Sequence, residues 1–396
     1  MNTVTESAEI MNVKMTGFRR CTAAIDGNLP DRVPAYTPTI ASDVAGKILG
    51  REAHTGGPGL WYAEAVAWSQ GSSAWKEFDA QITEDIIDLH RALKLDVIRF
   101  PWRNNIKPAR QLDDCTFVSL LDDGSEEIWR WDDVTLNFIR VSGSKTESVE
   151  QWPDRARRAE RELERRIAHA EINAGAPEAD LQQRLGDEML VAATGGMLSL
   201  GLDEGELMAP LLEPAAVEDI LDCDLAVALA ELDAIAARGI GVVLGGGDMA
   251  DKNGTIYSPE LFRRFMLPRW KRIAERSREL SLHYVWRSDG NLWAVSDMLF
   301  EEAGMPGFGE ADYDASMTIA SIKARYPDLV VWSNVSGDLL RRGTADEVYA
   351  HCAKLLAASE GRRYFHGCSN TILPGTPPEN VYAMMRARED FRDLGF

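Results

Sequence analysis

The feature that most constrains the fold is an alternation of short apolar segments with longer amphipathic ones. From about residue 96 onward, segments with the composition of strands recur, and a helical pattern of apolar residues follows each. We expect strands at 96–100, 189–194, 241–244, 283–286, 307–309, 329–332 and 363–366. Repeated strand–helix units predict a parallel sheet, and about seven or eight units favour a closed (β/α)8 TIM barrel over an open sheet.

Helices are expected between these strands, at 80–93, 214–238, 258–280, 292–303, 317–325, 345–360 and 378–391. Ser258 before Pro259, and Thr344 three residues before Glu347, are signals of helix N-termini. Gly-x-Gly-x-x-Gly follows none of the expected strands, which argues against a dinucleotide-binding fold. The glycine run at 245–247 lacks the Lys-Ser/Thr of a phosphate loop, and we interpret it as a place where a ligand approaches the backbone.

One stretch interrupts the alternation. Segments at 117–120, 128–131 and 135–140, with turns at 122–124 and 132–133, predict an antiparallel β-meander inserted after the first barrel strand. A charged helix at about 148–174 follows it. This insertion, about 113–185, either covers the barrel mouth or forms an edge or dimer surface. The whole chain, 1–396, is expected to be a single domain, because it has no low-complexity linker.

Composition narrows the partners and the compartment. The net charge of −20 argues against nucleic acid and anionic membranes as partners, because phosphate binding requires clustered Lys and Arg. No apolar run is long enough for a transmembrane helix, and residues 1–9 lack the apolar core of a signal peptide. Five irregularly spaced cysteines fit a reducing compartment. We therefore expect a cytoplasmic protein that acts on a small molecule.

Two strand ends carry the residues best suited to chemistry. Because side chains alternate along a strand, Arg287 and Asp289 share one side of the fourth strand segment, and His366 and Cys368 share one side of the last. If both sides face the barrel axis, these side chains converge at the mouth, near Asp248. The structural alternatives are that Arg287 pairs with Asp289 or caps a helix, and that Cys368 is a small buried apolar residue.

Other candidates for substrate binding follow strands or lie in loops. They are His54, Trp102, Arg103, Tyr257, Asn291, Glu310 and Asn334. Trp102 beside Arg103 suits a flat anionic substrate, since an aromatic ring can stack while a guanidinium pairs with the charge. For each of these residues a structural role, as a turn, cap or packing residue, stays open.

Several of these segments together resemble the uroporphyrinogen decarboxylase superfamily, which includes cobalamin-linked methyltransferases. The matching segments are 30–34, 247–254, 258–262, 288–291, 333–340 and 376–380. The resemblance implies a (β/α)8 barrel with its site in the C-terminal mouth. It also implies a homodimer, because dimers are common in that superfamily.

The chain departs from the superfamily at two places. Residues 34–39 stand where true uroporphyrinogen decarboxylases carry an arginine-rich loop, which argues against a tetrapyrrole substrate. Arg287 and Asp289 stand where the methyltransferase branch has the His-x-Cys of its zinc site, and arginine cannot ligate a metal because it stays protonated. Either a rebuilt Zn²⁺ site uses Asp289, His366 and Cys368, or the pocket holds no metal.

Our leading interpretation is a methyltransferase or demethylase for a small aromatic or anionic methylated substrate. Asp248, Arg287 and Asp289 would be catalytic, and a corrinoid supplied by a partner protein is the candidate acceptor. The alternative is a decarboxylase, a carbon–carbon lyase in which Arg287 or Arg103 orients a carboxylate and Asp248 stabilises positive charge and helps deliver a proton. A third alternative, of another class, is a non-catalytic module that binds a ligand or a corrinoid protein.

Overall fold

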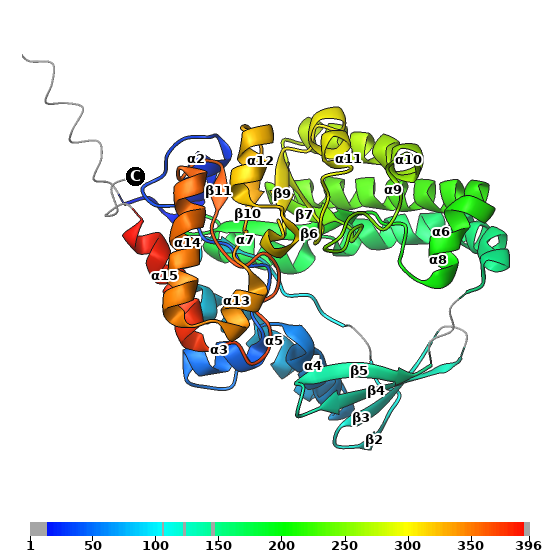
Figure 1. The fold of residues 1–396 in the computed structure, drawn as a ribbon. Helices are drawn as coiled ribbons and strands as arrows, with labels where there is room; N and C mark the ends of the chain where they lie inside the picture. The colour runs from blue at the N-terminus through cyan, green and yellow to red at the C-terminus, as the bar shows by residue number, and fades with distance from the viewer. Residues whose placement is uncertain (1–13, 105–106, 122–123, 144–146, 392–396) are drawn as a thin grey trace, which may run out of the picture.

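Seven parallel strands form one curled sheet, and they neighbour one another in the order of the chain (Figure 1). The computed structural model describes residues 14–391, apart from 105–106, 122–123 and 144–146, so the N-terminal segment 1–9 and part of the turn predicted at 122–124 lie outside the described residues. The strands are β1 (Val97–Ile98), β6 (Leu190–Met197), β7 (Val242–Gly246), β8 (His283–Arg287), β9 (Gly307–Gly309), β10 (Val330–Trp332) and β11 (Tyr364–Phe365).

A short segment at 34–36 closes this sheet into a barrel. The Tyr36 amide donates to the His366 carbonyl at 2.9 Å, and the His366 amide donates to the Pro34 carbonyl at 2.8 Å. On the other side, the Asp96 amide donates to the Ala35 carbonyl at 3.0 Å, just before β1. The segment therefore takes the eighth strand position, between β11 and β1, and the predicted (β/α)8 architecture is confirmed.

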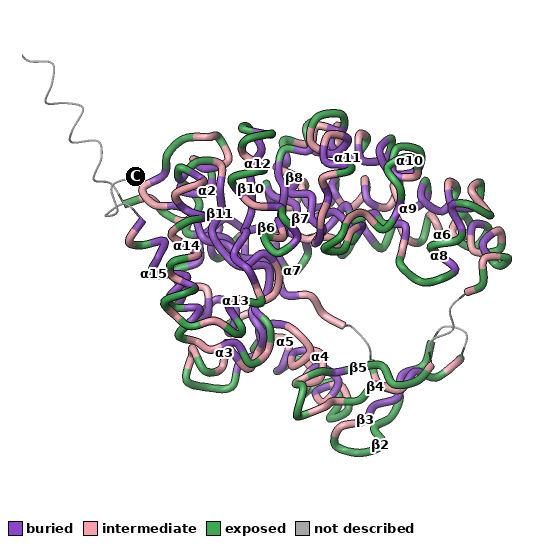
Figure 2. The backbone as a smooth tube through the Cα atoms, in the orientation of Figure 1, coloured by how far each residue is buried: buried purple, intermediate pink, exposed green. Residues whose placement is uncertain are grey.

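Apolar side chains fill the barrel interior. They come from β1, β6, β7, β8, β10 and β11, and they include Val97, Ala192, Leu244, Val285, Trp332 and Phe365, all buried. Figure 2 shows the backbone at this centre largely in the buried class. The rings of Trp332 and Phe365 stack with centroids 3.7 Å apart, so the centre is packed solid rather than open as a pore. Chemistry is therefore confined to the ends of the barrel.

Helices surround the sheet (Figure 1). They are α2 (Gly17–Ile25), α3 (Ser42–Leu49), α4 (Gly57–Ser69), α5 (Ser72–Leu93), α6 (Trp152–Asn173), α7 (Ala176–Leu185), α8 (Glu204–Leu212), α9 (Pro214–Ala237), α11 (Leu267–Glu279), α12 (Ile319–Arg325), α13 (Gly337–Arg342), α14 (Ala345–Ser359) and α15 (Pro378–Asp390). The helix predicted at 258–280 is divided into α10 (Pro259–Leu261), a π-helical stretch and α11. At 292–303 only the end is regular, as the π-helical stretch η4 (Met298–Glu302). Within the described ranges, no helix has the length and apolar character needed to cross a membrane.

The predicted meander is a four-stranded antiparallel sheet of β2 (Arg110–Asp113), β3 (Thr116–Leu120), β4 (Glu126–Asp132) and β5 (Asn137–Ser142). Its buried face places Phe117 and Phe138 against Ala65 and Tyr62 of α4. The sheet follows the second barrel strand, not the first, because 34–36 is the first. It stands beside the barrel on α4 (Figure 1), whereas the predicted helical part of the insertion packs against α9 in the outer layer as α6.

A buried cluster of charges fastens the N-terminal end of the barrel. The Asp96 carboxylate accepts hydrogen bonds from Arg20 of α2, from Arg388 of α15 at 3.0 Å and from the Ala35 amide at 2.8 Å. The carboxylate thus joins both ends of the described chain to the closing segment and β1. Because every partner of this buried charge is a hydrogen-bond donor, burial of Asp96 is compensated.

Candidate active site

A cavity of about 260 Å³ lies at the C-terminal mouth of the barrel. Its walls come from the segments that follow β1, β6, β7, β8 and β9, and they are Trp102, Met197, Ser199, Leu202, Gly245, Gly247, Asp248, Arg287 and Glu310. Parallel barrels place their reactive side chains at this end, because the strand ends point several side chains into one space. Four of the predicted site residues line this cavity: Trp102, Asp248, Arg287 and Glu310.

Arg287 and Glu310 form the polar centre of the mouth. Arg287 points inward from the end of β8, and its Nη1 lies 3.0 Å from Oε1 of Glu310. Its Nε also donates to the carbonyl of Gly245 at 3.2 Å. Glu310 follows β9 with φ +61, a left-handed backbone that turns its side chain toward Arg287. Burial raises the pKa of Glu310, although Arg287 acts in the opposite direction.

Asp289 is the most strongly perturbed carboxyl group beside this pair. Burial, together with the nearby Glu310 and Asp248 carboxylates, raises the pKa of Asp289 to about 7. Asn370, which sequence reasoning did not single out, donates to Asp289 Oδ2 at 2.5 Å and opposes the shift. Asp248 is exposed after β7. At neutral pH, Asp289 is therefore divided between an acid and a carboxylate, which suits proton transfer.

Two guanidinium groups lie over the ring of Trp102. The Cζ atoms of Arg99 and Arg287 are 4.4 and 4.8 Å from its centroid. Arg99, a residue that sequence reasoning also missed, is buried and donates to the Pro38 carbonyl at 2.9 Å and to Thr39 Oγ1 at 2.8 Å. The available signal was a single arginine in the otherwise apolar run 97–100. Trp102 is thus held as a wall of the mouth by cation–π contacts.

The glycine run at 245–247 serves the packing of the protein itself. A Cβ at Gly245 would lie 1.9 Å from the hydroxyl of Tyr284, and one at Gly246 would lie 2.2 Å from the Arg287 carbonyl oxygen. The Tyr284 hydroxyl donates to the Gly196 carbonyl at 2.6 Å and accepts from the Gly246 amide at 2.9 Å. The run therefore lets three neighbouring strands approach one another. Gly245 and Gly247 also line the cavity, so the approach of a ligand to this backbone stays a prediction.

Residues 207–391 match the family model described as uroporphyrinogen decarboxylase (URO-D). These residues, which include β7 to β11, resemble that family. A methyltransferase from Methanosarcina mazei has a similar fold, with a TM-score of 0.60 and 17% identity over 96% of this chain and 99% of that chain. D-psicose 3-epimerase gives a TM-score of only 0.35, at 12% identity over 57% of this chain and 84% of that chain, and this score does not indicate a shared fold. A comparison with curated proteins found no match.

The last strand of the barrel faces the opposite way from our prediction. Phe365 points into the barrel, whereas His366 and Cys368 point outward and are buried under the helices. His366 Nε2 lies 3.3 Å from the Met384 carbonyl of α15, and Cys368 Sγ lies 3.7 Å from the Thr371 carbonyl. Burial lowers the pKa of His366 to about 3 and raises that of Cys368 to about 12.

The three predicted zinc ligands are consequently not gathered. Asp289 lies at the mouth, while His366 and Cys368 lie on the outer side of the segment that continues β11. Over the part of the chain that the structure describes, no three His, Cys, Asp or Glu side chains are grouped so that they could hold a metal ion. The donor set that the sequence suggested does not fit Zn²⁺.

Three other candidates have polar side chains that bond to the protein backbone. Asn334 is buried; its Oδ1 accepts from the Ile319 amide at 2.8 Å, and its Nδ2 donates to the Ala311 and Met317 carbonyls. The Tyr257 hydroxyl donates to the Gly201 carbonyl at 2.6 Å, and Asn291 Oδ1 accepts from the Trp293 amide at 3.2 Å. These bonds fix the conformations of the loops that carry them, and none of the three residues lines the cavity at the mouth.

Arg103 and His54 lie away from the mouth, among the N-terminal helices. Arg103 pairs with Glu64 of α4 and Asp79 of α5, at 2.7 Å each. His54 packs against Phe78 of α5, with ring centroids 4.9 Å apart, and lines a separate cavity. Neither side chain lines the cavity at the mouth of the barrel.

Proposed function

We propose that this chain is a URO-D-like enzyme that transfers a methyl group from a small methyl ether held in the barrel mouth. The observation that carries the proposal is the Asp289 carboxyl. It does not itself line the cavity, but it lies close enough to the lining residues Glu310 and Asp248 for their charges, together with burial, to raise its pKa to about 7. The likeness in fold to a methyltransferase supports this class of reaction.

The proposed step needs an acid. When the methyl group passes to a nucleophilic acceptor, the ether C–O bond breaks and its electron pair stays on oxygen. A phenol has a pKa of about 10, higher than the pKa of about 7 of Asp289, so proton transfer from Asp289 to the leaving oxygen is favourable. Loss of that proton leaves Asp289 as a carboxylate, which recovers a proton from water. Asp248, exposed on the same side, is the candidate to relay it.

The charges of the mouth favour a neutral substrate. Arg287 is already occupied by Glu310 and by the Gly245 carbonyl, and Asp248 and Asp289 add two carboxyl groups. A substrate carboxylate would have to displace a buried ion pair. For the same reason, no contact singles out the decarboxylase alternative: Arg103, its other candidate, is paired with Glu64 and Asp79.

The methyl acceptor is a second substrate in this proposal. A corrinoid protein stays our prediction for it, and a metal-activated acceptor has no support from the donor set described above. Residues of this chain would bind and orient the ether between Trp102 and the glycine run. They would also supply the proton at Asp289.

The test combines the purified chain with reduced cobalamin and a panel of aryl methyl ethers, and it measures the released phenol by chromatography. Asp289→Asn should lower turnover by at least about 100-fold, because general acid catalysis is lost. Asp346→Asn, an exposed carboxylate at the start of α14, should leave turnover unchanged. Release of CO₂ from aromatic acids instead would establish the decarboxylase, and tight ligand binding without turnover would establish a binding module.

A further inference from the structure

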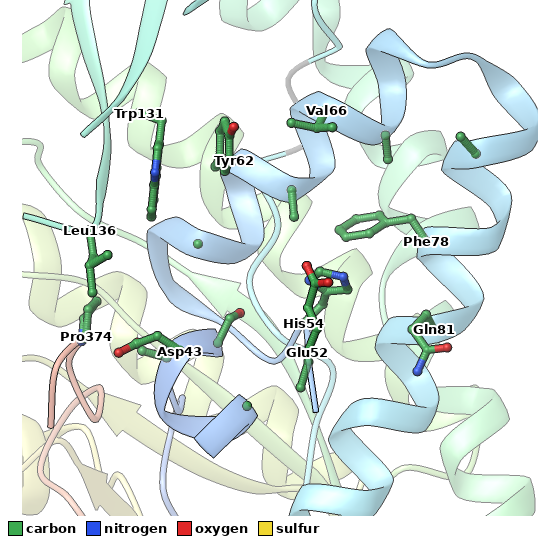
Figure 3. A pocket seen from close by; sticks show the side chains of 18 of the residues that line it. Asp43, Glu52, His54, Tyr62, Val66, Phe78, Gln81, Trp131, Leu136 and Pro374 are labelled. Atoms are coloured by element: carbon green, nitrogen blue, oxygen red, sulfur yellow. The ribbon is translucent and has the colours of Figure 1, made fainter. Parts of the chain in front are cut away.

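A second and larger cavity, of about 740 Å³, lies outside the barrel. It is bounded by α3, α4 and α5, by the β4–β5 hairpin and by Pro374 (Figure 3). It shares no lining residue with the mouth. Its volume falls within the range of about 300–1,000 Å³ that is typical of small-molecule sites. The inserted sheet supplies Trp131 and Leu136 to its wall, so the insertion completes this cavity.

Aromatic side chains line two sides of the cavity. Tyr62 of α4 stacks on Trp131 of β4, with ring centroids 4.8 Å apart and an interplanar angle of 15°. Opposite them, Phe78 of α5 lies near His54 (Figure 3). Aromatic faces attract cations through their quadrupole, and the attraction grows when water is excluded.

Carboxylates supply the charge of this cavity. Asp43, Glu52 and Glu77 line it, and its described lining contains no lysine or arginine. Asp43 is partly occupied, since it accepts from the Gly375 amide at 2.9 Å and lies 3.8 Å from Lys47 Nζ. Among the described residues, neither Glu52 nor Glu77 forms an ion pair. Figure 3 shows Glu52 beside His54, on the same side of the cavity as Phe78.

The arginine side chains next to the cavity, Arg51 and Arg103, are paired with carboxylates outside its lining. Arg51 pairs with Asp85 and with Asp88, the latter at 2.6 Å. Arg103, whose Cζ lies 5.7 Å from the Phe78 ring, pairs with Glu64 and Asp79. Glu52 and Glu77 are exposed lining residues without an ion-pair partner among the described residues. Together with the aromatic faces they make the cavity complementary to a positive charge on an apolar body.

We propose that this cavity is a binding site for a small organic cation, a substituted ammonium whose alkyl groups contact Tyr62, Phe78 and Trp131 while Glu52 and Glu77 balance its charge. A neutral molecule of the same shape gains the apolar contacts but not the attraction to the carboxylates or to the ring faces. An anion is repelled. The site does not depend on the methyl transfer proposed for the mouth.

Calorimetric titration with choline, and with its neutral isostere 3,3-dimethylbutan-1-ol, tests the proposal on the full chain. Choline should bind at least about tenfold more tightly than the isostere. Glu52→Gln with Glu77→Gln should weaken choline binding about tenfold and leave the isostere unchanged. Phe78→Leu should weaken choline about fivefold. Glu164→Gln, an exposed carboxylate on α6, is the matched control and should change neither.

Equal affinity for choline and the isostere would overturn the proposal, as would a glutamine double variant that binds choline as the wild type does. The mouth is excluded as the binding place by Asp248→Asn, which removes an exposed carboxylate from its lining and should leave choline binding unchanged. Loss of choline binding in that variant would instead place the cation at the mouth. Circular dichroism of each variant separates a lost site from a lost fold.

Discussion

Arg287 and Glu310 form an ion pair of 3.0 Å at the mouth of the barrel, with only 3% and 7% of their side chains exposed. Two charges so deeply buried stabilise the protein only while both are present, because removal of one leaves the other without compensation. The pair therefore fixes the shape and the charge of the cavity together. Because Arg287 is bound to Glu310, it is not the free anion-binding group that the sequence suggested.

Glu310→Gln tests this dependence. We expect the free energy of unfolding to fall by about 3 kcal/mol, because Arg287 keeps its charge without a carboxylate partner. Urea denaturation at pH 7 measures it. Glu302→Gln removes one partner of an exposed pair with Arg263 and should cost less than about 1 kcal/mol. Equal losses in the two variants would show that burial of the Arg287–Glu310 pair has no special weight.

Asp289→Asn should change how stability depends on pH. A carboxyl whose pKa is about 7 when folded and about 3.9 when unfolded binds its proton more tightly in the folded state. The wild type therefore loses stability as pH rises from about 4 through 7, and asparagine does not. We expect the variant to gain about 1–3 kcal/mol relative to the wild type at pH 8, and little at pH 4. A constant difference across thermal melts from pH 4 to 8 would contradict the assignment.

Gly245→Ala should be strongly destabilising. Its Cβ would lie 1.9 Å from the Tyr284 hydroxyl, which is fixed by bonds to Gly196 and Gly246. We expect a loss of at least about 2 kcal/mol in the free energy of unfolding. Gly241→Ala is the matched control, because its Cβ would meet no atom within 4 Å. If both variants melt like the wild type, the strands separate more easily than these contacts imply.

Asn334→Ala should loosen the loop after β9. Three hydrogen bonds, to Ile319, Ala311 and Met317, would be lost from a buried side chain, at a cost of about 3 kcal/mol. Hydrogen exchange should report faster exchange at 311–319. The exposed Asn173, which bonds within its own helix, offers the comparison: Asn173→Ala should leave that loop protected. Unchanged exchange at 311–319 in Asn334→Ala would argue for a role in ligand binding instead.

The sequence predicted most of the barrel, and the failures share one cause. Strands of a closed barrel are buried on both faces, so an alternation of polarity cannot show which face points inward. The prediction of the inward face was correct in β8, where the polar residues His283 and Arg287 mark the inner side. It failed in the last strand, where Phe365 and His366 are both buried. The segment at 34–36 was missed because it is a single β-bridge long and is followed by Pro38.

Most of the site could not be read from sequence for a related reason. Asn334 and Tyr257 follow strand ends as ligand-binding residues do, but their partners are backbone groups of distant loops. Arg99 and Asn370 were overlooked because their roles arise only when β1 and the loop after β11 meet the mouth. Residue type and spacing indicated the correct end of the barrel, and tertiary contacts decided which side chains line it.

The closing segment has a consequence for synthesis. Ala35 is synthesised early. Its bridge partner His366, and Arg388, which bonds to Asp96, are synthesised near the end of the described chain. During translation the 34–36 segment can pair with the residues before β1 early, but its other edge stays unpaired until β11 has been synthesised. Barrel closure is thus a late event. A shortened product ending before β11 would leave β10 and the 34–36 segment each with an unpaired edge. Completion of β11 is therefore the step that removes a site of aggregation.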